Sequence, residues 1–509
     1  MNILVVTGKL AENTARKSVK DKADVLVLDI EVAAFTTPAL LRRSLPQKKY
    51  DLILIPGMSS GDFSGLEKEL GIAIRLGPKH AVDLGFVLSF AGNADFSTKI
   101  PACELLIEKK HSNAIDKVIE LENIAVSPLT LRSLKIGGNS RMKIMAEIVD
   151  AGNLEKNELV KKIIYFIDSG ADIIDLGISL DTSRPDVRKT VKTAKSVTDI
   201  PLSVDTLEPD LINEAIDAGI DIVLSLNSKN IDKVKDSIIK KSMVSVIIPD
   251  RSDDLESLFY NIESAHSFGI KNIIADPVLE PAGHGISRSI SRYCEFRERD
   301  KTTPLFFGVG NVTELIDADS IGVNSILCGI AMELGASILF TPEFSHKACG
   351  SVSELKTAST MMMLSQNRGS APKDLGVDML KIKEKRRREY GKLPPTFIDA
   401  KGSEKWHLDP SGCFKIEITD DEIRNGKLYP GKIMARNNTN ININTNIVNI
   451  NNIINDNTIV GSTAKEILET IIERGLISRI DHAAYLGREL MKAELALKFK
   501  RSYSQDDKF

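Results

Sequence analysis

The central part of the chain repeats one pattern eight times, and this repetition limits the fold more than any other feature. Short apolar runs alternate with amphipathic segments, several of which end in glycine, as helices often do. The apolar runs occupy residues 143–149, 171–178, 201–205, 221–227, 243–249, 273–279, 304–309 and 338–341. Eight β–α units over about 200 residues match the number and length typical of a TIM-type (β/α)8 barrel. We therefore predict such a barrel within residues 142–365, with a binding site at the carboxyl ends of its strands.

The flanking residues predict two smaller domains, so the fold class is α/β with a central (β/α)8 barrel. In residues 1–134 the runs ILVVTG, VLVLDI and DLILIPG alternate with polar stretches, which is typical of a small α/β domain with a parallel sheet. Residues 366–405 predict a helical and basic linker. Residues 406–509 predict a small α+β domain, with strands in FKIEI and KIMAR and helices at 462–475 and 481–499.

Two segments have a biased composition. The run KIKEKRRREYGK at 381–392 is basic, but glutamates interleave it, so a solvated helix face is favoured over an RNA or membrane patch. The pair Pro394–Pro395 then predicts a boundary, and the third domain starts near Trp406. The tract at 437–457 is rich in asparagine and isoleucine, and so many amides cannot all find partners in a core. We expect it to form an expanded surface loop.

Charge, cysteine content and hydropathy exclude several classes of function. The 67 basic and 70 acidic side chains leave a net charge of −3, which gives no reason to expect nucleic acid as a partner. The five cysteines lack C-x-x-C spacing, so neither a metal site nor a disulfide framework is predicted. No apolar run reaches the ~18 residues of a membrane span. We expect a soluble, cytoplasmic protein whose oligomeric state is open, with a homodimer as one option.

Glycines after the first strands allow two interpretations. They are Gly8, Gly57, Gly61 and Gly65, and the stretch LGPKH adds Gly77, Lys79 and His80. Such residues could form a phosphate site, but neither G-x-x-x-x-G-K-[ST] nor G-x-G-x-x-G is present. Ordinary turns are therefore the favoured interpretation.

Polar side chains follow most of the predicted barrel strands. They are Glu147, Asp150, Asp175, Asp205, Asn227, Ser228, Asp276 and Asn311, and Arg184 follows in the loop after the second strand. A ring of Asp and Asn with no opposed His or Cys is poor metal or nucleophile chemistry. It suits a flat heterocycle such as a pterin, whose amine and ring N–H edge donates to a carboxylate while amides serve its carbonyl and ring nitrogens. Any one of these residues could instead cap a β–α loop, but the whole set favours a ligand site.

Two segments carry a family resemblance. GADIIDLGISLDTSRP at 170–185, followed by PLSVDT at 201–206, resembles the dihydropteroate synthases, whose pterin-binding barrel carries an IIDIGGESTRP loop and an SVDT strand. The match covers about residues 142–345. The resemblance implies that Asp205 holds the pterin's amino edge, that Asp276 holds its other polar side, and that Arg184 lies in a mobile loop over a second substrate.

Other segments depart from that family. Its N-V-T-P-D-S-F stretch, S-x-K lysine and R-x-H pair are not clear here, whereas AEIVD, LNS, DPVLEP and GVGNVTE resemble motifs of the pterin-dependent methyltransferases, which share the barrel. This second resemblance implies that Asn311 hydrogen-bonds near the pterin N5 and that Asn227 and Asp276 bind the ring.

The order of the three domains is similar to that of archaeal dihydropteroate synthase-related proteins, from organisms that use tetrahydromethanopterin. The segment DHAAYLGRELMKAELALK also weakly resembles a region associated with the corrinoid-carrying component of the tetrahydromethanopterin methyltransferase, which would make His482 a cobalt ligand. The favoured interpretation is structural, with Asp481 as a helix N-cap and His482 in the first turn.

Two classes of function stay open. The first is an enzyme that acts on a reduced pterin, either tetrahydromethanopterin or a dihydropterin precursor, together with an unidentified second substrate or carbon acceptor. It would build a pterin–arylamine bond, with Arg184 stabilising a departing pyrophosphate, or move a one-carbon unit from N5 with the help of Asn311. The second class is a non-catalytic pterin-binding or regulatory protein, which the missing synthase residues would explain.

Overall fold

The computed structural model describes residues 1–382, 396, 398, 400–402, 407–424, 427–438 and 458–507. The chain divides into two compact units, one of Met1–Asn123 with Leu364–Asp378 and the other of Ile124–Met363 with Met379–Phe509. Several predicted features lie outside the described residues, namely the basic run after Ile382, the boundary at Pro394–Pro395, Trp406 and residues 439–457 of the asparagine-rich tract.

Eight parallel strands within the described residues close into a barrel, as the sequence predicts. They are β7 (Lys143–Ile148), β8 (Ile173–Gly177), β9 (Leu202–Asp205), β10 (Ile222–Leu226), β11 (Val244–Ile247), β12 (Asn272–Ala275), β13 (Leu305–Phe307) and β14 (Ala336–Thr341). The pairing of Ile338 in β14 with Lys143 in β7 closes the ring. The predicted (β/α)8 barrel is therefore confirmed.

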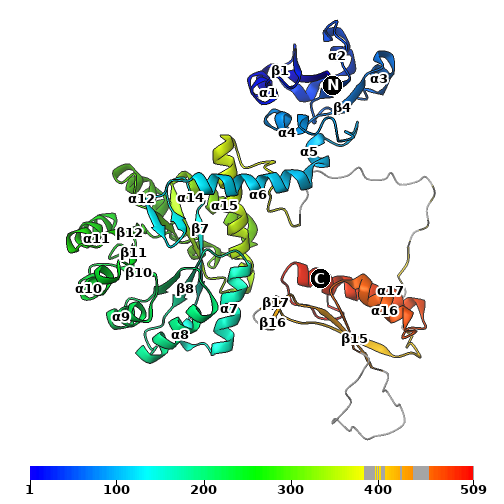
Figure 1. Cartoon of the computed structure of the whole chain (residues 1–509). Coiled ribbons are helices and arrows are strands. Elements are labelled where there is room, and N and C mark those ends of the chain that lie inside the picture. Colours follow the sequence, from blue (N-terminus) through cyan, green and yellow to red (C-terminus); the bar gives the residue numbers. More distant parts are fainter. Residues whose placement is uncertain are drawn as a thin grey trace. The chain divides into compact units, whose positions relative to one another are not determined.

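Helices surround the strands (Figure 1). They are α7 (Lys156–Asp168), α8 (Arg184–Val197), α9 (Pro209–Ala218), α10 (Ile231–Lys241), α11 (Leu255–Phe268), α12 (Ile286–Arg299), α13 (Gly310–Thr313), α14 (Ser320–Glu333) and α15 (Ser351–Arg368). Gly219 and Gly269 end α9 and α11 in the left-handed conformation, with φ of 102° and 99°. These are the glycine C-caps that the sequence predicts.

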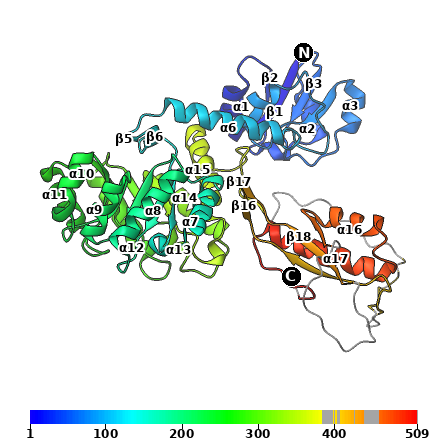
Figure 2. The same cartoon turned by 60° about the horizontal axis from the view of Figure 1, so that its bottom comes forward.

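A short hairpin covers the amino ends of the barrel strands (Figure 2). It consists of β5 (Leu129–Leu131) and β6 (Leu134–Ile136), and Leu129 and Ile136 pack on the apolar side chains inside the barrel. In its turn, Arg132 binds the carboxylate of Asp221, which precedes β10, at 2.9 and 3.0 Å. The carboxyl ends of the strands form the opposite end of the barrel, where a ligand would enter.

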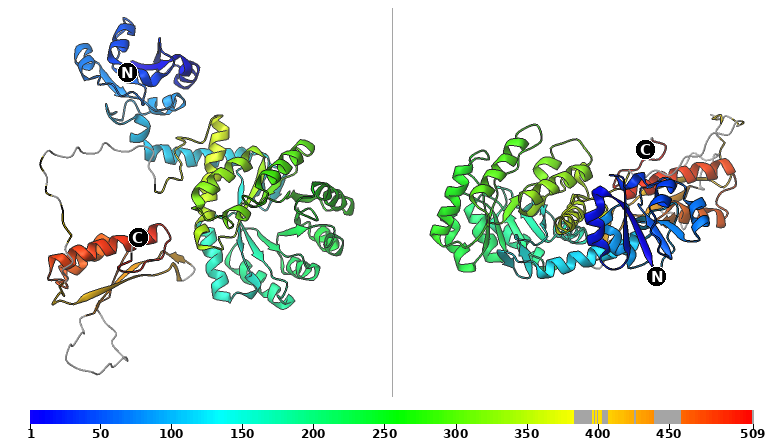
Figure 3. Two further views of the ribbon diagram at one scale, coloured as in Figure 1. Left: turned by 180° about the vertical axis from the view of Figure 1, so that it is seen from behind. Right: turned by 90° about the horizontal axis from the view of Figure 1, so that it is seen from above.

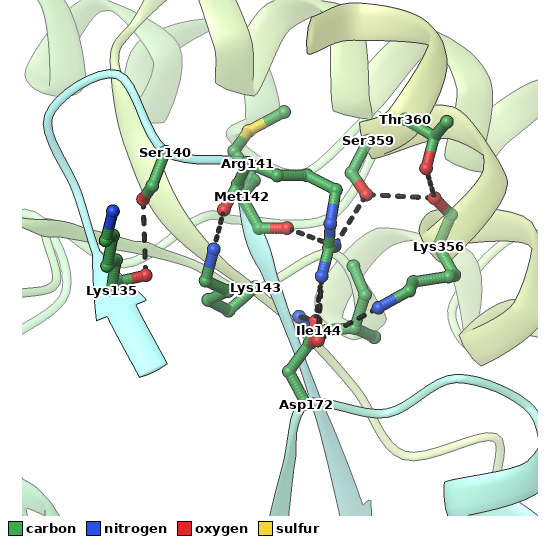
Figure 4. A network of polar contacts seen from close by, with 10 residues as sticks. All are labelled: Lys135, Ser140, Arg141, Met142, Lys143, Ile144, Asp172, Lys356, Ser359 and Thr360. Carbon is green, nitrogen blue, oxygen red and sulfur yellow. Dashed lines mark hydrogen bonds and ion pairs between the residues drawn. The ribbon is translucent and has the colours of Figure 1, made fainter. Parts of the chain in front are cut away.

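A buried ion-pair network ties the start of the barrel to α15 (Figure 4). Nη2 of Arg141 donates to both carboxylate oxygens of Asp172, at 2.7 and 2.8 Å, and Nζ of Lys356 donates to the same carboxylate at 2.9 Å. Nη1 of Arg141 also donates to Ser359 Oγ at 3.0 Å. Burial alone would raise the pKa of Asp172, but the two cations outweigh it and hold that pKa well below its usual range.

The N-terminal unit contains a parallel sheet with strand order β2-β1-β3-β4. The sequence predicts β1 (Ile3–Gly8), β2 (Asp24–Leu28) and β3 (Leu52–Ile55). It does not predict β4 (Ala73–Leu76), which is as short as β3 and whose apolar run is interrupted by Arg75. Its helices are α1 (Glu12–Val19), α2 (Pro38–Ser44), α3 (Ser64–Leu70), α4 (Leu84–Leu88), α5 (Ala102–Leu105) and α6 (Ile107–Ile124).

Two features of this unit come from close backbone packing. A Cβ atom on Gly57 would lie 2.5 Å from the carbonyl oxygen of Gly77, so glycine is required where the loops after β3 and β4 meet. Nε2 of His80 lies 2.7 Å from Asp374 Oδ2, which attaches the segment Leu364–Asp378 to the unit.

The C-terminal region forms an α+β layer, with α16 (Ala464–Glu473) and α17 (Ile480–Lys498) on one face of an antiparallel sheet (Figure 3). The sheet has the order β15 (Cys413–Ile418), β18 (Ile433–Asn438) and β19 (Thr458–Gly461), and β16 (Glu422–Arg424) pairs separately with β17 (Lys427–Tyr429). The strand β18 thus includes Asn437 and Asn438, which begin the predicted loop. Among the described residues, no helix combines the length and apolar character that a membrane crossing requires.

The predicted N-cap at Asp481 is wrong. The N-cap of α17 is Arg479, and Asp481 lies inside the first turn. Asp409 accepts the backbone N–H groups of Ser478 and Arg479, both at 3.0 Å, and so holds the segment that leads into α17, which begins one residue before Asp481. The same carboxylate lies 3.0 Å from Nδ1 of His482, whose buried position supports the structural interpretation of that histidine.

Candidate functional site

Strand alternation brings the predicted carboxylates to the inside of the barrel. Met145, Ile173 and Ile274 pack in its interior, and each is followed two residues later by Glu147, Asp175 or Asp276 on the same face. In the sheet, Glu147 lies beside Asp175, Asp175 beside Ser203, and Gly177 beside Asp205. The carboxyl ends of β7, β8, β9 and β12 thus contribute one carboxylate each to a cluster at the barrel mouth.

Asp175 is the most buried member, with no exposed surface. Ser203 Oγ donates a hydrogen bond to its Oδ1 at 2.5 Å, whereas its Oδ2 has no hydrogen-bond partner among the described residues. Burial, and then the nearby charges of Asp205 and Glu147, raise the pKa of Asp175 well above its ordinary value.

Asp205 lies at the centre of the cluster, since its charge also acts on Glu147 and Asp276. Ser225 Oγ donates to Asp205 Oδ1 at 2.7 Å. Burial raises the pKa of Asp205, and the Ser225 hydrogen bond opposes that shift. The mouth thus concentrates carboxyl groups whose ionised forms lack cationic ion-pair partners among the described residues and can bind positive or hydrogen-bond-donating groups.

Glu147 has a pKa close to neutral pH. Burial, followed by the charges of Asp205 and Glu314, raises its pKa to about 7. A Cβ atom on Gly177 would lie 2.7 Å from Glu147 Oε1, so glycine in β8 leaves the room that this carboxyl group occupies. A carboxyl group with this pKa can release or take up a proton at the pH of most cells.

Asp276 is held by two donors. The backbone N–H of Val278 and the hydroxyl of Tyr293, in α12, each lie 2.8 Å from its Oδ1. Burial raises the pKa of Asp276 to about 6, against the effect of these hydrogen bonds. Its side chain is thereby fixed in orientation.

Two residues next to the cluster adopt the left-handed backbone conformation, with φ of 62° at Ser225 and 64° at Val278. Neither is glycine, and Val278 is β-branched, so each conformation costs on the order of 1–3 kcal/mol. In these conformations the Ser225 hydroxyl donates a hydrogen bond to Asp205, and the Val278 N–H donates one to Asp276. Strain at such positions is a common property of functional sites.

The predicted amides lie at the same end of the barrel. Asn227 is buried after β10, and its Oδ1 accepts a hydrogen bond from Lys229 N at 3.0 Å. Asn311 lies at the start of α13 with an exposed side chain, and its Nδ2 donates to the carbonyl of Leu279 at 2.8 Å. Asn311 therefore ties the loop after β13 to the loop that carries Asp276.

Arg184 and Asp150 do not join the carboxylate cluster. Arg184 is the first residue of α8, not part of a loop, and its Nη2 lies 3.4 Å from Glu214 Oε2 in α9, which also pairs with Arg188. Asp150 is exposed, with φ of 56°, at the N-cap of the 3-10 turn Ala151–Asn153. The remaining predicted site residues, Glu147, Asp175, Asp205, Asn227, Asp276 and Asn311, lie at the barrel mouth.

The sequence analysis missed four residues that shape the cluster, namely Ser203, Ser225, Tyr293 and Glu314. Ser203 could have been found, because it precedes Asp205 by two residues and must share its face. Tyr293 lies inside a helix of the outer ring, and no local signal in the sequence connects it with Asp276.

Matches to protein families cover three parts of the chain. Residues 147–261 match the family described as pterin binding enzyme. Residues 408–506 match a family described as PterinBD-DUF4346, and residues 1–79 match a family of unknown function, DUF6513.

One relative matches along nearly the entire chain. It is an uncharacterized protein of Methanocaldococcus jannaschii, 38% identical over 538 aligned positions that cover 99% of this chain and 98% of the relative.

Solved structures similar to this chain include two bacterial dihydropteroate synthases. The Yersinia pestis enzyme with a pterine-sulfa conjugate is 19% identical, with a TM-score of 0.39, over 47% of this chain and 99% of that chain. The Thermus thermophilus enzyme is 17% identical, with a TM-score of 0.38, over 45% of this chain and 96% of that chain.

Proposed function

This chain belongs to the family of the Methanocaldococcus jannaschii protein and, through its barrel, to the pterin-binding TIM barrels related to dihydropteroate synthases, and from this we propose that it is a transferase acting on a reduced pterin. The observation that carries the proposal is the set of buried carboxyl groups at the barrel mouth, with Asp205 at its centre. Their raised pKa values favour a ligand that donates hydrogen bonds and accepts a proton.

In the proposed complex, Asp205 and Asp276 hold the donor edge of the pterin. A carboxylate accepts two parallel N–H bonds from an amine and an adjacent ring nitrogen, which is the pattern that a pterin offers. Asn227 binds the ring carbonyl or a ring nitrogen. Asp175 is more deeply buried. Its Oδ2 has no partner among the described residues and can form a further hydrogen bond with the pterin.

For the reaction, we favour transfer of a one-carbon unit from N5. When the carbon unit passes from N5 to a nucleophilic acceptor, the electron pair of the broken N–C bond stays on N5, which must then take up a proton. Glu147, with a pKa of about 7, can supply that proton. Asn311 fixes the neighbouring loop and presents an amide beside the ring. No covalent bond to the protein is required.

Synthesis of a pterin–arylamine bond is the second candidate. It needs cations that stabilise a departing pyrophosphate. Arg184 pairs with Glu214 instead, which weighs against this candidate, but an arginine-lined cavity after β11 and β12 favours it.

Further parts of the proposal follow from the resemblance of the chain. We propose tetrahydromethanopterin, or a dihydropterin precursor of it, as the pterin, an unidentified molecule as second substrate or carbon acceptor, and the cytoplasm as the location. The organism of the relative supports an archaeal cofactor of this kind. A corrinoid acceptor has little support, because Asp409 already engages His482.

Mass spectrometry of the small molecules that co-purify with the native protein tests the proposal, together with binding of tetrahydropterins to Asp205→Asn. We expect a retained pterin, and a loss of affinity of about 10- to 100-fold in this variant, since one charged hydrogen-bond acceptor is removed. The control is Asp232→Asn, a change at an exposed carboxylate of α10. Equal pterin affinity in the two variants would contradict the assigned site, and pterin binding without any group transfer would establish the non-catalytic alternative.

A further inference from the structure

The sheet of the N-terminal unit contains a topological switch point between β1 and β3. Ala15 and Val19 of α1 pack on one face of this sheet, together with Val5 of β1. Leu66 of α3 packs on the other face, together with Ile53 of β3. The chain therefore leaves β1 towards one face and leaves the adjacent β3 towards the opposite face. In open parallel sheets, ligands bind at such switch points, outside the carboxyl ends of the strands.

Two buried hydroxyl groups lie at this switch point. The register of β1 with β3, continued by two residues, places Thr7 opposite Pro56. The N–H of Ser59 donates to the carbonyl of Pro56 at 2.9 Å, so Ser59 lies next to the same strand ends. Oγ of Ser59 has no hydrogen-bond partner among the described residues, and Oγ1 of Thr7 donates to the carbonyl of Gly8 at the long distance of 3.4 Å.

These hydroxyl groups indicate that the strand ends bind a polar ligand. Thr7 is 3% exposed and Ser59 is 8% exposed. Buried polar groups almost always have hydrogen-bond partners, because a buried group without one costs free energy. A bound phosphate, whose oxygens accept hydrogen bonds from hydroxyl groups, would provide a partner for each.

A charged pair lies at the ends of β1 and β2. Gly8 pairs with Leu28, and Lys9 and Asp29 directly follow these two residues in the chain. Nζ of Lys9 lies 2.5 Å from Oδ1 of Asp29, and the Asp29 side chain is largely exposed. Exposed ion pairs are weak, so a ligand can separate them. A lysine then binds phosphate, and a carboxylate at the end of the second strand accepts hydrogen bonds from ribose hydroxyls.

The loop after β2 brings an aromatic ring to the same edge of the sheet. A Cβ atom on Gly8 would lie 2.9 Å from the backbone nitrogen of Ala33, so this loop passes close to the end of β1. A Cβ atom on Gly61, in the loop after β3, would lie 3.3 Å from Pro38 Cδ. Phe35 lies between these two contacts in the chain, and its side chain is exposed. A flat base can stack on such a ring.

We propose that this edge of the N-terminal sheet binds a nucleoside monophosphate. The hydroxyl groups of Thr7 and Ser59 hold the phosphate together with Lys9. Asp29 accepts hydrogen bonds from the ribose, and the base lies on Phe35. A single phosphate is favoured, because the loop TGKLAE after β1 lacks the further glycines with which a backbone approaches a pyrophosphate. The site belongs to the N-terminal unit, so it does not depend on the pterin assignment.

Calorimetric titration of the full-length protein with AMP, GMP, CMP and UMP tests the proposal, with ribose 5-phosphate and inorganic phosphate as partial ligands. We expect at least one nucleotide to bind about tenfold more tightly than ribose 5-phosphate, since its base stacks on Phe35. Phe35→Ala should remove this difference and leave the affinity for ribose 5-phosphate unchanged. Failure of all four nucleotides to bind, or binding equal to that of ribose 5-phosphate, would overturn the assignment.

Asp29→Asn tests the contact with the ribose. The wild type should prefer ribose 5-phosphate to inorganic phosphate, and the variant should reduce this preference about tenfold, because a charged acceptor is lost. The matched control is Asp21→Asn, an exposed carboxylate in the turn before β2, at the opposite end of the strand. An equal preference in the two variants would exclude Asp29 from the site.

Ser59→Ala tests the contact with the phosphate. The melting temperature of the ligand-free protein should not fall, because the hydroxyl has no partner to lose among the described residues. The affinities for nucleotide and inorganic phosphate should both fall about tenfold. Ser89→Ala, which removes an exposed hydroxyl bonded to the carbonyl of Phe86, should leave both unchanged. Wild-type affinities in Ser59→Ala would contradict the proposal.

Binding of nucleotide and of a tetrahydropterin to the same proteins separates this inference from the proposed function. Phe35→Ala and Ser59→Ala should bind the tetrahydropterin as the wild type does, and Asp205→Asn should bind the nucleotide as the wild type does. Nucleotide binding that is lost in Asp205→Asn and kept in Phe35→Ala would place the nucleotide in the barrel and overturn the inference.

Discussion

The hydroxyl of Tyr293 lies 2.8 Å from Asp276 Oδ1 and 2.9 Å from the carbonyl oxygen of Phe306, so a helix of the outer ring reaches the barrel mouth. The single hydroxyl proton serves one acceptor at a time. When Asp276 is ionised, Tyr293 donates to the carboxylate. When Asp276 carries its proton, it can donate to the Tyr293 oxygen, and the hydroxyl proton turns to Phe306.

Replacing Tyr293 by phenylalanine should raise the pKa of Asp276 above about 6, because one hydrogen bond to the ionised form is lost. The free energy of unfolding should fall by about 1–3 kcal/mol, since buried acceptors lose a donor while the ring still packs against Phe307. Urea unfolding and pterin binding between pH 5 and pH 8 measure both effects. The exposed Tyr260→Phe is the control, and an equal response in the two variants would refute the role of Tyr293.

The ligand-free protein should become less stable as the pH rises towards 8. The pKa of Glu147 is about 7 in the folded protein against 4.5 for an ordinary glutamate, so its contribution is full below 4.5 and is lost as the pH rises through about 7. Glu147→Gln should remove this dependence and stabilise the protein at pH 8, on the order of 1–3 kcal/mol. Thermal unfolding across this range tests it, with the exposed Glu158→Gln as control. If the pH dependence of stability is the same in Glu147→Gln as in the wild type, the carboxyl group of Glu147 does not titrate in this pH range.

Asn311→Ala should leave pterin affinity within about threefold of the wild type and lower group transfer at least about 100-fold, if Asn311 acts at N5 in the transition state. Single-turnover rates and equilibrium binding separate the two effects. The control is Asn213→Ala in α9, because Asn213 also donates one Nδ2 hydrogen bond to a backbone carbonyl. Turnover equal to the wild type in Asn311→Ala would refute the assignment.

Arg141→Ala should lower the free energy of unfolding by about 3–5 kcal/mol, because it leaves the buried Asp172 with Lys356 as its remaining ion-pair partner (Figure 4). Denaturant unfolding measures the loss. Arg299→Ala breaks an exposed pair and should cost less than about 1 kcal/mol. A similar small loss in both variants would mean that the network adds little to stability.

The barrel could be predicted because its signals are local. Each strand is a short apolar run, each helix has an amphipathic pattern, and glycines such as Gly219 and Gly269 end helices where the sequence places them. The period of two along each strand also gives the direction of Asp175 and Asp205 without any knowledge of the fold.

The remaining features depend on contacts between distant residues. Arg184 follows β8 in the sequence, as the loop motif predicts. Its guanidinium group pairs with Glu214, which lies thirty positions later in the chain. The N-cap at Asp481 fails for a similar reason, because the distant Asp409 holds Ser478 and Arg479 and the helix begins at Ile480, ahead of Asp481. Tyr293 reaches Asp276 only after α12 packs on the barrel, so its role could not be read from the helix itself.

The N-terminal unit is built from two pieces of chain that flank the barrel, and this affects the order in which the protein can mature on the ribosome. Residues 1–123 emerge first, but Asp374, the partner of His80, is synthesised only after the last barrel strand at Ala336–Thr341. The surface on which Leu364–Asp378 packs therefore stays exposed to solvent while some 200 residues of barrel are translated. Expression of residues 1–134 alone would make that unfinished state permanent.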